Sequence, residues 1–456
     1  MTSLLWLRRN LRAHDNKILY NALHSTSPIQ PIFIFDQDIL KDFTNKSDPR
    51  LSFIAELLVD LHQYFVSKNS GLIILYGSAR EIIPRVALTL SVDNIYADED
   101  FEPDNIIRDT YIKNCLDPEN INLILDNDHL ILNSRELKPY KVFTPYSKAW
   151  HSLLTKEHYR KYEYDKEVYA DYNQLLAQLT GFKIITPHNA RSMLKEIGYD
   201  YAPHPLWNAS DGANRLFHFT NHHLDGYKMH RDYMGENKTS QLSPYLRFGA
   251  LSIREVLRAT LGRSDSYVHE LIWRDFYTSI MHHFPYSVDK EFKPEYQSLK
   301  WKYNKNLFEL FTQGKTGYPI VDAAINQLKT EYWMHNRSRM IVASFACKHL
   351  LIDWRMGEKF FREYLMDYEL ASNVGGWQWA ASTGVDAQPY FRIFNPDLQT
   401  EKFDHDASYI KKFLPELQNV PPKYIANPLE FDRHLKYPDK IVNHKKAREE
   451  VFAFFK

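Results

Sequence analysis

Short apolar runs alternate with amphipathic segments over the first 135 residues of the chain. Residues 51–68 place apolar side chains three and four positions apart, which is the spacing of one helix face. Short strands separated by helices are typical of parallel βαβ units, so we expect a Rossmann-like, doubly wound parallel sheet. The runs expected to form its strands are residues 4–7, 32–35, 72–76, 94–97 and 130–132.

The pattern changes to helical periodicity alone from about residue 205. The intervening residues carry several prolines and a single helical segment, 172–179, which is typical of a connector. We therefore expect an α/β domain at 1–135, a connector at 136–204 and an all-helical domain at 205–456. The segments with a 3.6-residue period in the helical domain are 253–261, 268–283, 318–331, 335–353 and 358–366.

Composition narrows the class of protein without identifying it. The 456 residues are 44% hydrophobic and 25% charged, which excludes disorder as the dominant state. Basic and acidic side chains both number 57, so the net charge is zero. This excludes binding of nucleic acid through a polybasic tail but leaves room for a local basic groove. The aromatic content of 14% fits either a well-packed core or a site that stacks planar rings.

Several common cofactor and catalytic motifs are missing from the sequence. No GxGxxG follows the first expected strand, no GxSxG is present, and residues 314–316 (GKT) lack the upstream glycine of a phosphate loop. Neither HExxH nor CxxC spacing occurs, and Cys115 and Cys347 are too few for a zinc site or a disulfide framework. No signal peptide or membrane-spanning run is visible. We therefore expect a metal-free, soluble, cytoplasmic protein.

Two segments have the residues of an anion site at the start of a helix. Ser243 followed by Pro244 is a strong N-cap and first-turn pair, and the hydroxyls before it could also hold an anion. Arg337 and Arg339 stand in the first turn of another expected helix, where the helix dipole disfavours cations. Either an internal carboxylate or a ligand phosphate would offset that penalty.

Two further segments combine polar and aromatic side chains. Glu270, Trp273, Arg274 and Tyr277 share one helical stripe, which could grip the edge and face of a base or could be a surface salt-bridge stripe. Residues 373–379 (NVGGWQW) place a glycine pair beside two indoles. Because paired glycines permit close approach or positive φ, we favour a binding site over simple packing there.

In their order along the chain, these motifs resemble the photolyase/cryptochrome family of flavoproteins, and most closely its class I cyclobutane pyrimidine dimer photolyases. The resemblance covers essentially the whole chain, and several motifs in the right order are more specific than any one of them. It implies an N-terminal α/β domain, a connector and a helical domain that holds a U-shaped FAD. The matching segments are residues 6–12 (WLRRNLR), 141–146, 239–248, 270–277 and 317–396.

The resemblance assigns FAD-binding residues in the C-terminal part of the chain. Asn373 would face N5 of the flavin, where an amide can donate or accept a hydrogen bond without carrying charge. Arg339 and Asp367 resemble the family's ion pair beside the flavin, whereas Glu369 stands where the family usually has Asp. The residues that would hold the phosphate and ribityl part of FAD are Tyr227, Thr239, Ser240, Gln241, Leu242 and Ser243.

The resemblance also implies the substrate, which is UV-damaged DNA with a thymine dimer flipped out of the duplex. Light-excited reduced FAD would transfer an electron to the dimer. Glu270 and Asn336 would hydrogen-bond the polar edge of the dimer, and Glu270 and Asn373 are the expected catalytic residues. Apolar walls are expected from Trp273, Met340 and Trp379, and contacts to DNA phosphates from Arg231, Arg274 and Arg337.

Electron supply and light harvesting follow from the same resemblance. Glu102 resembles an antenna contact, and we expect methenyltetrahydrofolate there rather than a deazaflavin. Val288 and Asp289 do not match the Cys-Lys contact of some folate-binding members. Three indoles match the family's chain for reduction of oxidised flavin, with ordinary packing as the alternative for each: Trp301, Trp354 and Trp377.

We expect, accordingly, a monomeric enzyme that repairs cyclobutane dimers in light. The alternatives are a blue-light cryptochrome without repair activity and a (6-4) photolyase. Asn373 weighs against the first because plant-type cryptochromes carry an acid there, and the chain ends at Lys456 without a long signalling tail. The dimer-pocket residues Asn336, Arg337 and Met340 resemble the cyclobutane type rather than the histidine-based (6-4) pocket, although His335 lies next to them.

Overall fold

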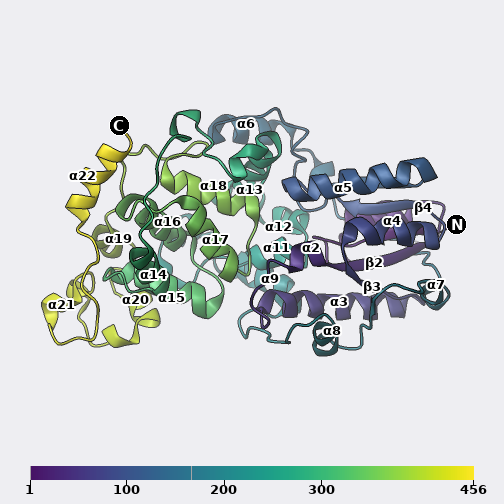
Figure 1. The fold of residues 1–456 in the computed structure, drawn as a ribbon, viewed down its shortest axis with the longest axis horizontal. Helices are drawn as coiled ribbons and strands as arrows, with labels where there is room; N and C mark the ends of the chain where they lie inside the picture. Colours follow the sequence, from purple (N-terminus) through teal and green to yellow (C-terminus); the bar gives the residue numbers. More distant parts are fainter. Residues whose placement is uncertain (1, 166) are drawn as a thin grey trace. The chain divides into compact units, whose positions relative to one another are not determined.

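A single mixed sheet organises the N-terminal part of the chain in the computed structural model, which describes residues 2–165 and 167–456 (Figure 1). Within these residues the strand order is β5-β4-β1-β2-β3-β6. The first five strands pair in parallel, and β6 pairs antiparallel at the edge next to β3. Their bounds are β1 Thr2–Trp6, β2 Ile29–Asp36, β3 Ile73–Gly77, β4 Val92–Asp98, β5 Asn122–Asp126 and β6 Ile184–Ile185.

The doubly wound sheet confirms the expected fold class, with one strand placed wrongly. Residues 130–132 form no strand, and the fifth parallel strand is β5. The reason lies in Asn127, whose side chain donates to the Leu130 carbonyl and accepts from the Leu130 amide (2.9 and 3.0 Å). These contacts occupy the backbone groups that a sheet ladder would need. The two-residue strand β6 is too short to give a sequence pattern.

Helices lie on both sides of the sheet, and helices joined by loops and short 3₁₀ turns make up the rest of the chain (Figure 1). Those that begin before residue 261 are α1 Lys17–Leu23, α2 Gln37–Leu40, α3 Pro49–Ser67, α4 Ala79–Thr89, α5 Pro103–Leu116, α6 Phe143–Leu153, α7 Tyr172–Gln178, α8 Ala190–Glu196, α9 Gly212–His222, α10 Tyr227–His230, α11 Ser243–Phe248 and α12 Ile253–Thr260. Those that follow are α13 Asp265–His283, α14 Lys305–Gln313, α15 Pro319–Glu331, α16 Asn336–Ser344, α17 Trp354–Tyr364, α18 Leu370–Ala381, α19 Pro396–Phe403, α20 Ser408–Phe413, α21 Pro428–Phe431 and α22 His444–Phe454.

The helix expected over residues 335–353 is shorter than the periodicity indicates. It begins as α16, continues as a π-helical turn over Phe345–His349, and stops there. Leu351 has a φ of 50°, a left-handed conformation in which a helix cannot continue. Asp353 then caps α17 by accepting a hydrogen bond from the Arg355 amide, so α17 also begins earlier than expected.

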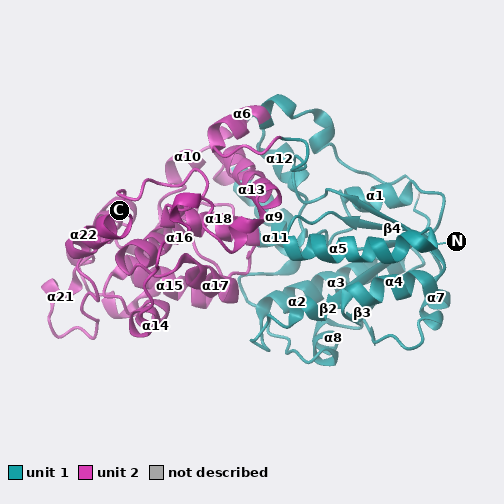
Figure 2. Cartoon of the chain, turned by 45° about the horizontal axis from the view of Figure 1, so that its top comes forward, with its two compact units in different colours: residues 1–137, 150–221, 241–262 teal, residues 138–149, 222–240, 263–456 magenta. Residues whose placement is uncertain are grey.

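The chain forms two compact units, which are described separately (Figure 2). The sheet unit comprises residues 1–137, 150–221 and 241–262, and the helical unit comprises residues 138–149, 222–240 and 263–456. Residues 241–262 belong to the sheet unit because Arg254 pairs with Asp15 and Asp128. The units are therefore not consecutive in sequence, and the expected domains at 1–135, 136–204 and 205–456 stay a prediction.

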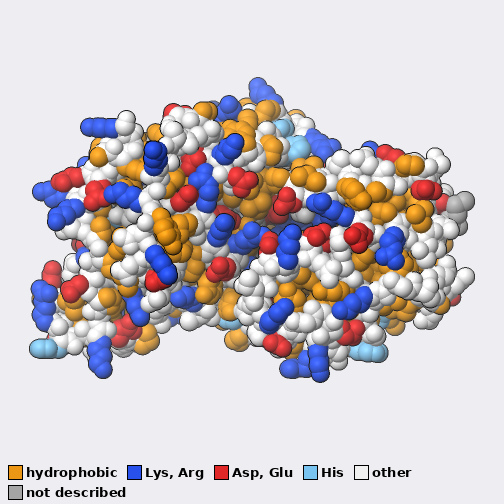
Figure 3. Space-filling view, viewed as in Figure 1, with side chains coloured by type: hydrophobic (Ala, Val, Ile, Leu, Met, Phe, Trp, Pro, Cys, Tyr) orange, Lys and Arg blue, Asp and Glu red, His pale blue; other side chains and the backbone are white. Residues whose placement is uncertain are grey.

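Each unit has its own apolar core. In the sheet unit the strands pack against α4 through Ile82 and Val86, both buried. In the helical unit the core gathers around α15, α16 and α18. No helix among the described residues is long and apolar enough to cross a membrane. On the face seen in Figure 3, acidic and basic side chains are interspersed.

Candidate functional site

Helix α13 carries two ion pairs on one face of the helical unit. Glu270 accepts a hydrogen bond from Arg231 (2.7 Å), and one turn later Arg274 donates to Glu369 (3.0 Å). The expected stripe is therefore helical, and its charged members bind residues of other elements rather than one another. The Glu at position 369 reaches Arg274 with its longer side chain.

An aromatic surface accompanies these charges on α13. Trp273 stacks face to face on Phe143 of α6, with ring centroids 3.8 Å apart and parallel planes. One face of the indole is thereby covered by protein, and Trp273 remains half-buried. Trp273 is expected in a dimer pocket, but this partner could not be predicted because Phe143 lies about 130 residues away in the sequence.

The start of α16 resolves the question raised by its two arginines. Arg337 pairs with Asp232 (2.8 Å) and Arg339 with Asp367 (2.7 Å), so internal carboxylates offset the dipole penalty at both positions. The ion pair expected between Arg339 and Asp367 is confirmed. Oδ1 of Asp367 is buried and makes no hydrogen bond, which leaves one strong acceptor for a ligand.

His335 caps α16 and is not an acid. Its ring nitrogen accepts a hydrogen bond from the Arg337 amide (3.1 Å), and burial lowers the pKa of His335 to about 4. The imidazole is therefore neutral near pH 7. Next to it, Asn336 is exposed and its side-chain nitrogen lies 3.9 Å from the sulfur of Met340, so these two expected dimer contacts are neighbours.

Helix α18 contains the glycine–tryptophan segment, which is regular helix throughout. Gly375 is required by packing, because a Cβ there would overlap the ring of Tyr277, whereas a Cβ on Gly376 would meet nothing within 4 Å. Of the two alternatives expected for the glycine pair, close approach applies at Gly375, and neither glycine adopts a positive φ. Trp377 is fully buried in the core, and Trp379 is half-buried beside it.

Asn373 sits in α18 with its amide tied to a buried carboxylate. Its nitrogen donates to the side chain and to the backbone carbonyl of Glu358 (both 3.1 Å), and Tyr368 donates to the same carboxylate (2.8 Å). Burial raises the pKa of Glu358 above its ordinary value, against the opposing effect of these hydrogen bonds. Sequence reasoning missed Glu358, whose only signal is its position one turn after Trp354.

The segment around residue 240 has a free hydroxyl. Oγ1 of Thr239 is buried without a partner, and Ser240 accepts a hydrogen bond from Tyr267 (3.0 Å). Tyr267 in turn packs edge-on against Tyr227 (5.1 Å), so these expected cofactor contacts in the helical unit are linked. A hydroxyl that lacks a partner can donate to a phosphate or accept from a ligand.

The expected cap at Ser243 is wrong by one position. Helix α11 begins at Ser243, its N-cap is Leu242, and no side chain caps it. The chain turns earlier because Gln241 adopts a left-handed conformation, with a φ of 50°. Gln241, Leu242 and Ser243 belong to the sheet unit, where Gln241 accepts a hydrogen bond from Arg215 (2.9 Å).

The three indoles expected to carry electrons are connected within the helical unit. Trp301 and Trp354 both donate to the same carboxylate oxygen of Glu291, at 2.9 and 3.2 Å. Gly357, one turn after Trp354 on α17, supports the ring of Trp377 so closely that a Cβ would overlap it. Electron transfer itself stays a prediction, but Trp354 and Trp377 belong to one apolar core and Trp301 packs against it.

A cavity of about 340 Å³ opens beside Arg337 in the helical unit. Two of its polar atoms, Nε of Arg337 and Oε1 of Gln399, are buried without a hydrogen-bond partner. Arg337 is the only one of its lining residues that the sequence predicts as a contact, because nothing in the local pattern marks a glutamine or lysine on α19. The lining residues are Met229, Asp232, Tyr233, Arg337, Phe394, Gln399, Lys402 and Phe403.

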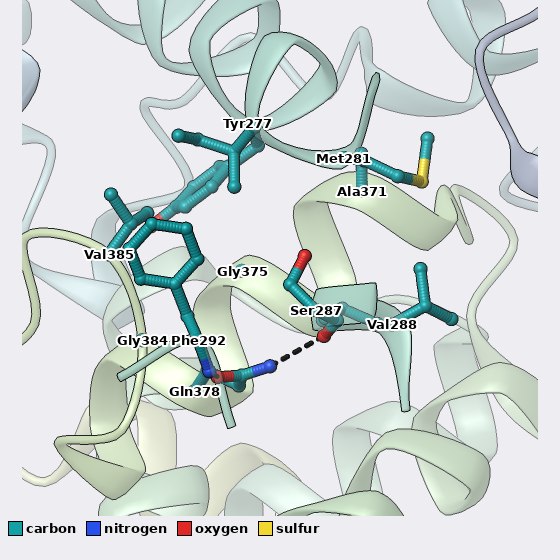
Figure 4. Close-up of a pocket in the computed structure, with 12 residues that line it drawn as sticks. Tyr277, Met281, Ser287, Val288, Phe292, Ala371, Gly375, Gln378, Gly384 and Val385 are labelled. Atoms are coloured by element: carbon teal, nitrogen blue, oxygen red, sulfur yellow. Dashed lines mark hydrogen bonds between the residues drawn. The ribbon is translucent and has the colours of Figure 1, made fainter. Parts of the chain in front are cut away.

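The expected antenna contact, Glu102, lies in the sheet unit, whereas Val288, which does not match the family's contact, lies in the helical unit. Glu102 of the sheet unit precedes α5, with its carboxylate 3.6 Å from Arg9 and 3.9 Å from Arg247. Val288 of the helical unit lines a cavity of about 20 Å³ together with Tyr277 and Phe292 (Figure 4). That volume holds about one water molecule, so it is not a cofactor site. No group of side chains suited to a metal occurs in the described part of the chain.

Two family descriptions match the chain. Residues 3–163 match "DNA photolyase", and residues 267–456 match "FAD binding domain of DNA photolyase". A deoxyribodipyrimidine photo-lyase of Alkalihalophilus pseudofirmus is 34% identical to this chain. The match covers 99% of this chain and 97% of that protein. One of Synechococcus is 35% identical, with 99% of this chain covering 96% of it.

Solved structures of the same kind superpose over the whole chain. A bacterial class III photolyase from Agrobacterium tumefaciens matches with a TM-score of 0.84 and 31% identity, over 100% of this chain and 97% of that one. An archaeal photolyase from Sulfolobus tokodaii, which holds two FAD molecules, matches with a TM-score of 0.84 and 31% identity, over 100% of this chain and 99% of that one. A cryptochrome from Synechocystis matches with a TM-score of 0.81 and 26% identity, over 99% of each chain.

Proposed function

The chain belongs to the photolyase/cryptochrome family and functions as a deoxyribodipyrimidine photo-lyase, and we propose that its helical unit splits pyrimidine dimers in DNA with an electron from light-excited reduced FAD. The observation that supports this most directly is the set of unpartnered buried polar atoms at residues that the family uses for FAD, on Thr239 and Asp367. Buried polar atoms without partners are uncommon in folded proteins and suggest a missing ligand.

The residues present fit FAD. Oγ1 of Thr239 can bind a phosphate or ribityl oxygen, and Oδ1 of Asp367 can accept a hydrogen bond from an N–H or O–H of the cofactor. Arg339 pairs with Asp367 at 2.7 Å, and Asn373 retains a carbonyl oxygen that can accept a hydrogen bond while its nitrogen donates to Glu358. When bound and reduced, FAD would supply one electron to the dimer after absorbing light.

The chain's own residues then bind and orient the flipped dimer. The Glu270 carboxylate accepts hydrogen bonds from the dimer's polar edge, and Asn336 offers both a donor and an acceptor to it. Trp273, Met340 and Trp379 exclude water as apolar walls. Because Arg231 fixes Glu270 at 2.7 Å, the acceptor is held in one orientation before the dimer arrives.

We propose that DNA lies against the helical unit with its phosphates near three paired arginines. Arg231, Arg274 and Arg337 each share their charge with a carboxylate, so binding must compete with these ion pairs. The cavity beside Arg337 adds Lys402 and Gln399 to the candidate contacts. Phosphate contacts position the duplex and carry no sequence information, which suits an enzyme that recognises damage rather than a base sequence.

For the antenna we propose methenyltetrahydrofolate, with a deazaflavin as the alternative. Glu102 is the candidate contact, and its two neighbouring arginines would also suit an anionic chromophore. Release of the bound chromophores from purified protein, followed by chromatography against both standards, separates the two. Release of a second flavin alone would contradict both. We further propose that the protein is cytoplasmic and monomeric, and sedimentation of the protein with and without DNA tests the monomeric state.

One experiment tests the proposed repair. Chemically reduced protein is incubated with an oligonucleotide that carries one defined thymine dimer, in blue light and in darkness, and restored thymines are quantified. We expect repair in light only, and no repair of a matched oligonucleotide with a (6-4) photoproduct, because Asn336, Arg337 and Met340 resemble the cyclobutane type of pocket rather than the histidine-based (6-4) type. Binding without repair in light would instead identify a cryptochrome-type photosensor.

A further inference from the structure

A single buried carboxylate joins two of the three indoles. Oε1 of Glu291 accepts hydrogen bonds from the indole nitrogens of Trp301 (2.9 Å) and Trp354 (3.2 Å). Glu291 is 3% exposed and precedes a short 3₁₀ turn, Pro294–Tyr296, outside every motif that carries the family resemblance. Its position therefore comes from the structure alone.

Arg355 completes the arrangement and makes the two indoles unequal. Its guanidinium donates to both carboxylate oxygens of Glu291 (3.0 and 2.8 Å) and also to Asp353 (3.0 Å). The same guanidinium lies over the ring of Trp354, 4.6 Å from its centroid. The nitrogens of both indoles thus face an anion, while the ring face of Trp354 also meets a cation.

Glu291 keeps its negative charge in this environment. Burial alone would raise its pKa, but hydrogen bonds from Arg355 and Trp301 lower the pKa of Glu291 below its ordinary value. A carboxylate that stays ionised in a region of low dielectric stabilises positive charge on a neighbouring ring more strongly than it would in water.

We propose that Glu291, paired with Arg355, is a positioning residue that makes loss of an electron easier at Trp301 than at Trp354, and so draws positive charge away from the flavin. A cation over an aromatic face is attracted to the neutral ring and repelled once that ring is positively charged. Trp354 meets this repulsion from Arg355, whereas Trp301 has the closer hydrogen bond to Glu291. This inference rests on the proposed role of the tryptophans.

The electron balance is simple. One electron leaves the Trp301 indole, passes through Trp354 and Trp377, and reduces the oxidised flavin by one electron. The indole of Trp301, oxidised by one electron, is then reduced by a thiol in solution. Glu291 exchanges neither electrons nor protons in this scheme, and its effect is electrostatic.

The test compares Glu291→Gln with Glu295→Gln, a nearby exposed glutamate, in FAD-loaded protein. Light-driven reduction of oxidised flavin is followed by absorbance with a thiol as donor. Glu291→Gln keeps the shape but removes the charge, and we expect roughly tenfold slower photoreduction, the factor that about 1.4 kcal/mol represents. Glu295→Gln should reduce at the wild-type rate, and Glu291→Asp, which keeps the charge, should recover most of it.

A second readout needs no activity. In protein labelled with ¹⁵N-tryptophan and kept dark, Glu291→Gln should shift the indole N–H resonances of Trp301 and Trp354 and leave that of Trp377 in place. Wild-type photoreduction in Glu291→Gln, with Trp301→Phe inactive, would overturn the inference and leave the electron path intact. Normal photoreduction in Trp301→Phe would instead reject the path itself, and this inference with it.

Discussion

The sheet unit contains a fully buried set of ion pairs around Asp128, whereas the pair of Arg337 with Asp232 in the helical unit is partly exposed. In the sheet unit Arg12 and Arg254 both bind Asp128 (2.6 and 2.8 Å), and the three side chains are at most 4% exposed. In the helical unit the side chains of Arg337 and Asp232 are 17% and 34% exposed. The first set is closed to any competitor, whereas the second can exchange a carboxylate for a phosphate.

The burial of an ion pair determines its role, because removing two charges from water costs free energy. A buried pair leaves an uncompensated charge when one partner is removed, so it fixes structure. A half-exposed pair contributes little to stability and can open when a ligand offers a better partner. The buried cluster around Asp128 is therefore structural, whereas the pair of Arg337 with Asp232 is available for function.

The largest effect should follow from breaking the buried set. Asp128→Ala leaves Arg12 and Arg254 without their shared carboxylate, and we expect a loss of about 3–5 kcal/mol in the free energy of unfolding. Thermal and urea unfolding of the purified protein measure this. Asp232→Ala is the matched control in the helical unit and should cost less than about 1 kcal/mol. Equal losses for the two variants would contradict the comparison.

The sequence predicts the local elements well and the long-range pairs poorly. Helix α3 and strands β1 to β4 follow from periodicity, because each depends on residues close together in the chain. Asp128 and Arg254 are 126 residues apart, and no local pattern indicates that they meet. Residues 130–132 have the composition of a strand, and only the contact from Asn127 explains why they are not one.

The candidate site likewise contains residues that the sequence predicts and residues that it does not. The pair of Arg339 with Asp367 was predicted because a whole motif carried it, and the dipole penalty gave an independent reason to expect a carboxylate. Glu358 and Glu291 could not be predicted, because a carboxylate on a helix or loop is ordinary in sequence and acquires meaning only through its neighbours. Such residues appear only once the fold has brought distant segments together.

The next largest effect on stability is expected from a buried lysine of the helical unit. It tests whether burial determines the cost of a charge there as well. Lys348 is fully buried, donates to the Ser382 hydroxyl (2.7 Å), and lies over the Phe455 ring. Burial lowers the pKa of Lys348 to about 7. Above that pH the folded state holds Lys348 neutral while the unfolded state still binds the proton, so stability should rise with pH up to about 10.

The gain between pH 7.5 and 9.5 should be roughly 2–3 kcal/mol, since each pKa unit corresponds to about 1.4 kcal/mol. Urea unfolding across that range measures it. Lys348→Met should lose the rise and be more stable than wild type at pH 6. A flat profile in the wild-type protein would show that Lys348 stays charged when folded.

Breaking a half-exposed pair at the dimer pocket should affect binding more than folding. Glu270→Ala removes the proposed acceptor for the dimer's polar edge, and we expect a loss of about 1.5–3 kcal/mol in affinity for dimer-containing DNA. FAD content and unfolding should change little. Glu309→Ala, an exposed glutamate of α14 paired with Lys305, is the matched control. Loss of FAD before loss of affinity would make Glu270 structural.

The smallest effect concerns salt, and it tests whether a half-exposed pair opens for a phosphate. Asp232 neutralises Arg337 at 2.8 Å at the edge of the 340 Å³ cavity. If Arg337 leaves Asp232 to bind DNA, then Asp232→Asn removes the competitor and should strengthen binding about two- to fivefold, the result of a surface pair worth less than about 1 kcal/mol. Arg337→Gln should weaken binding and lower the slope of log affinity against log salt by about 0.9, the value for one duplex phosphate.

Fluorescence anisotropy of a labelled duplex at several salt concentrations measures both variants. Tighter binding by Asp232→Asn together with a shallower slope for Arg337→Gln requires that the arginine changes partners, because an arginine that stayed with its carboxylate would leave the slope unchanged. Unchanged affinity in Asp232→Asn would place Arg337 with the structural pairs of the sheet unit, despite its exposure.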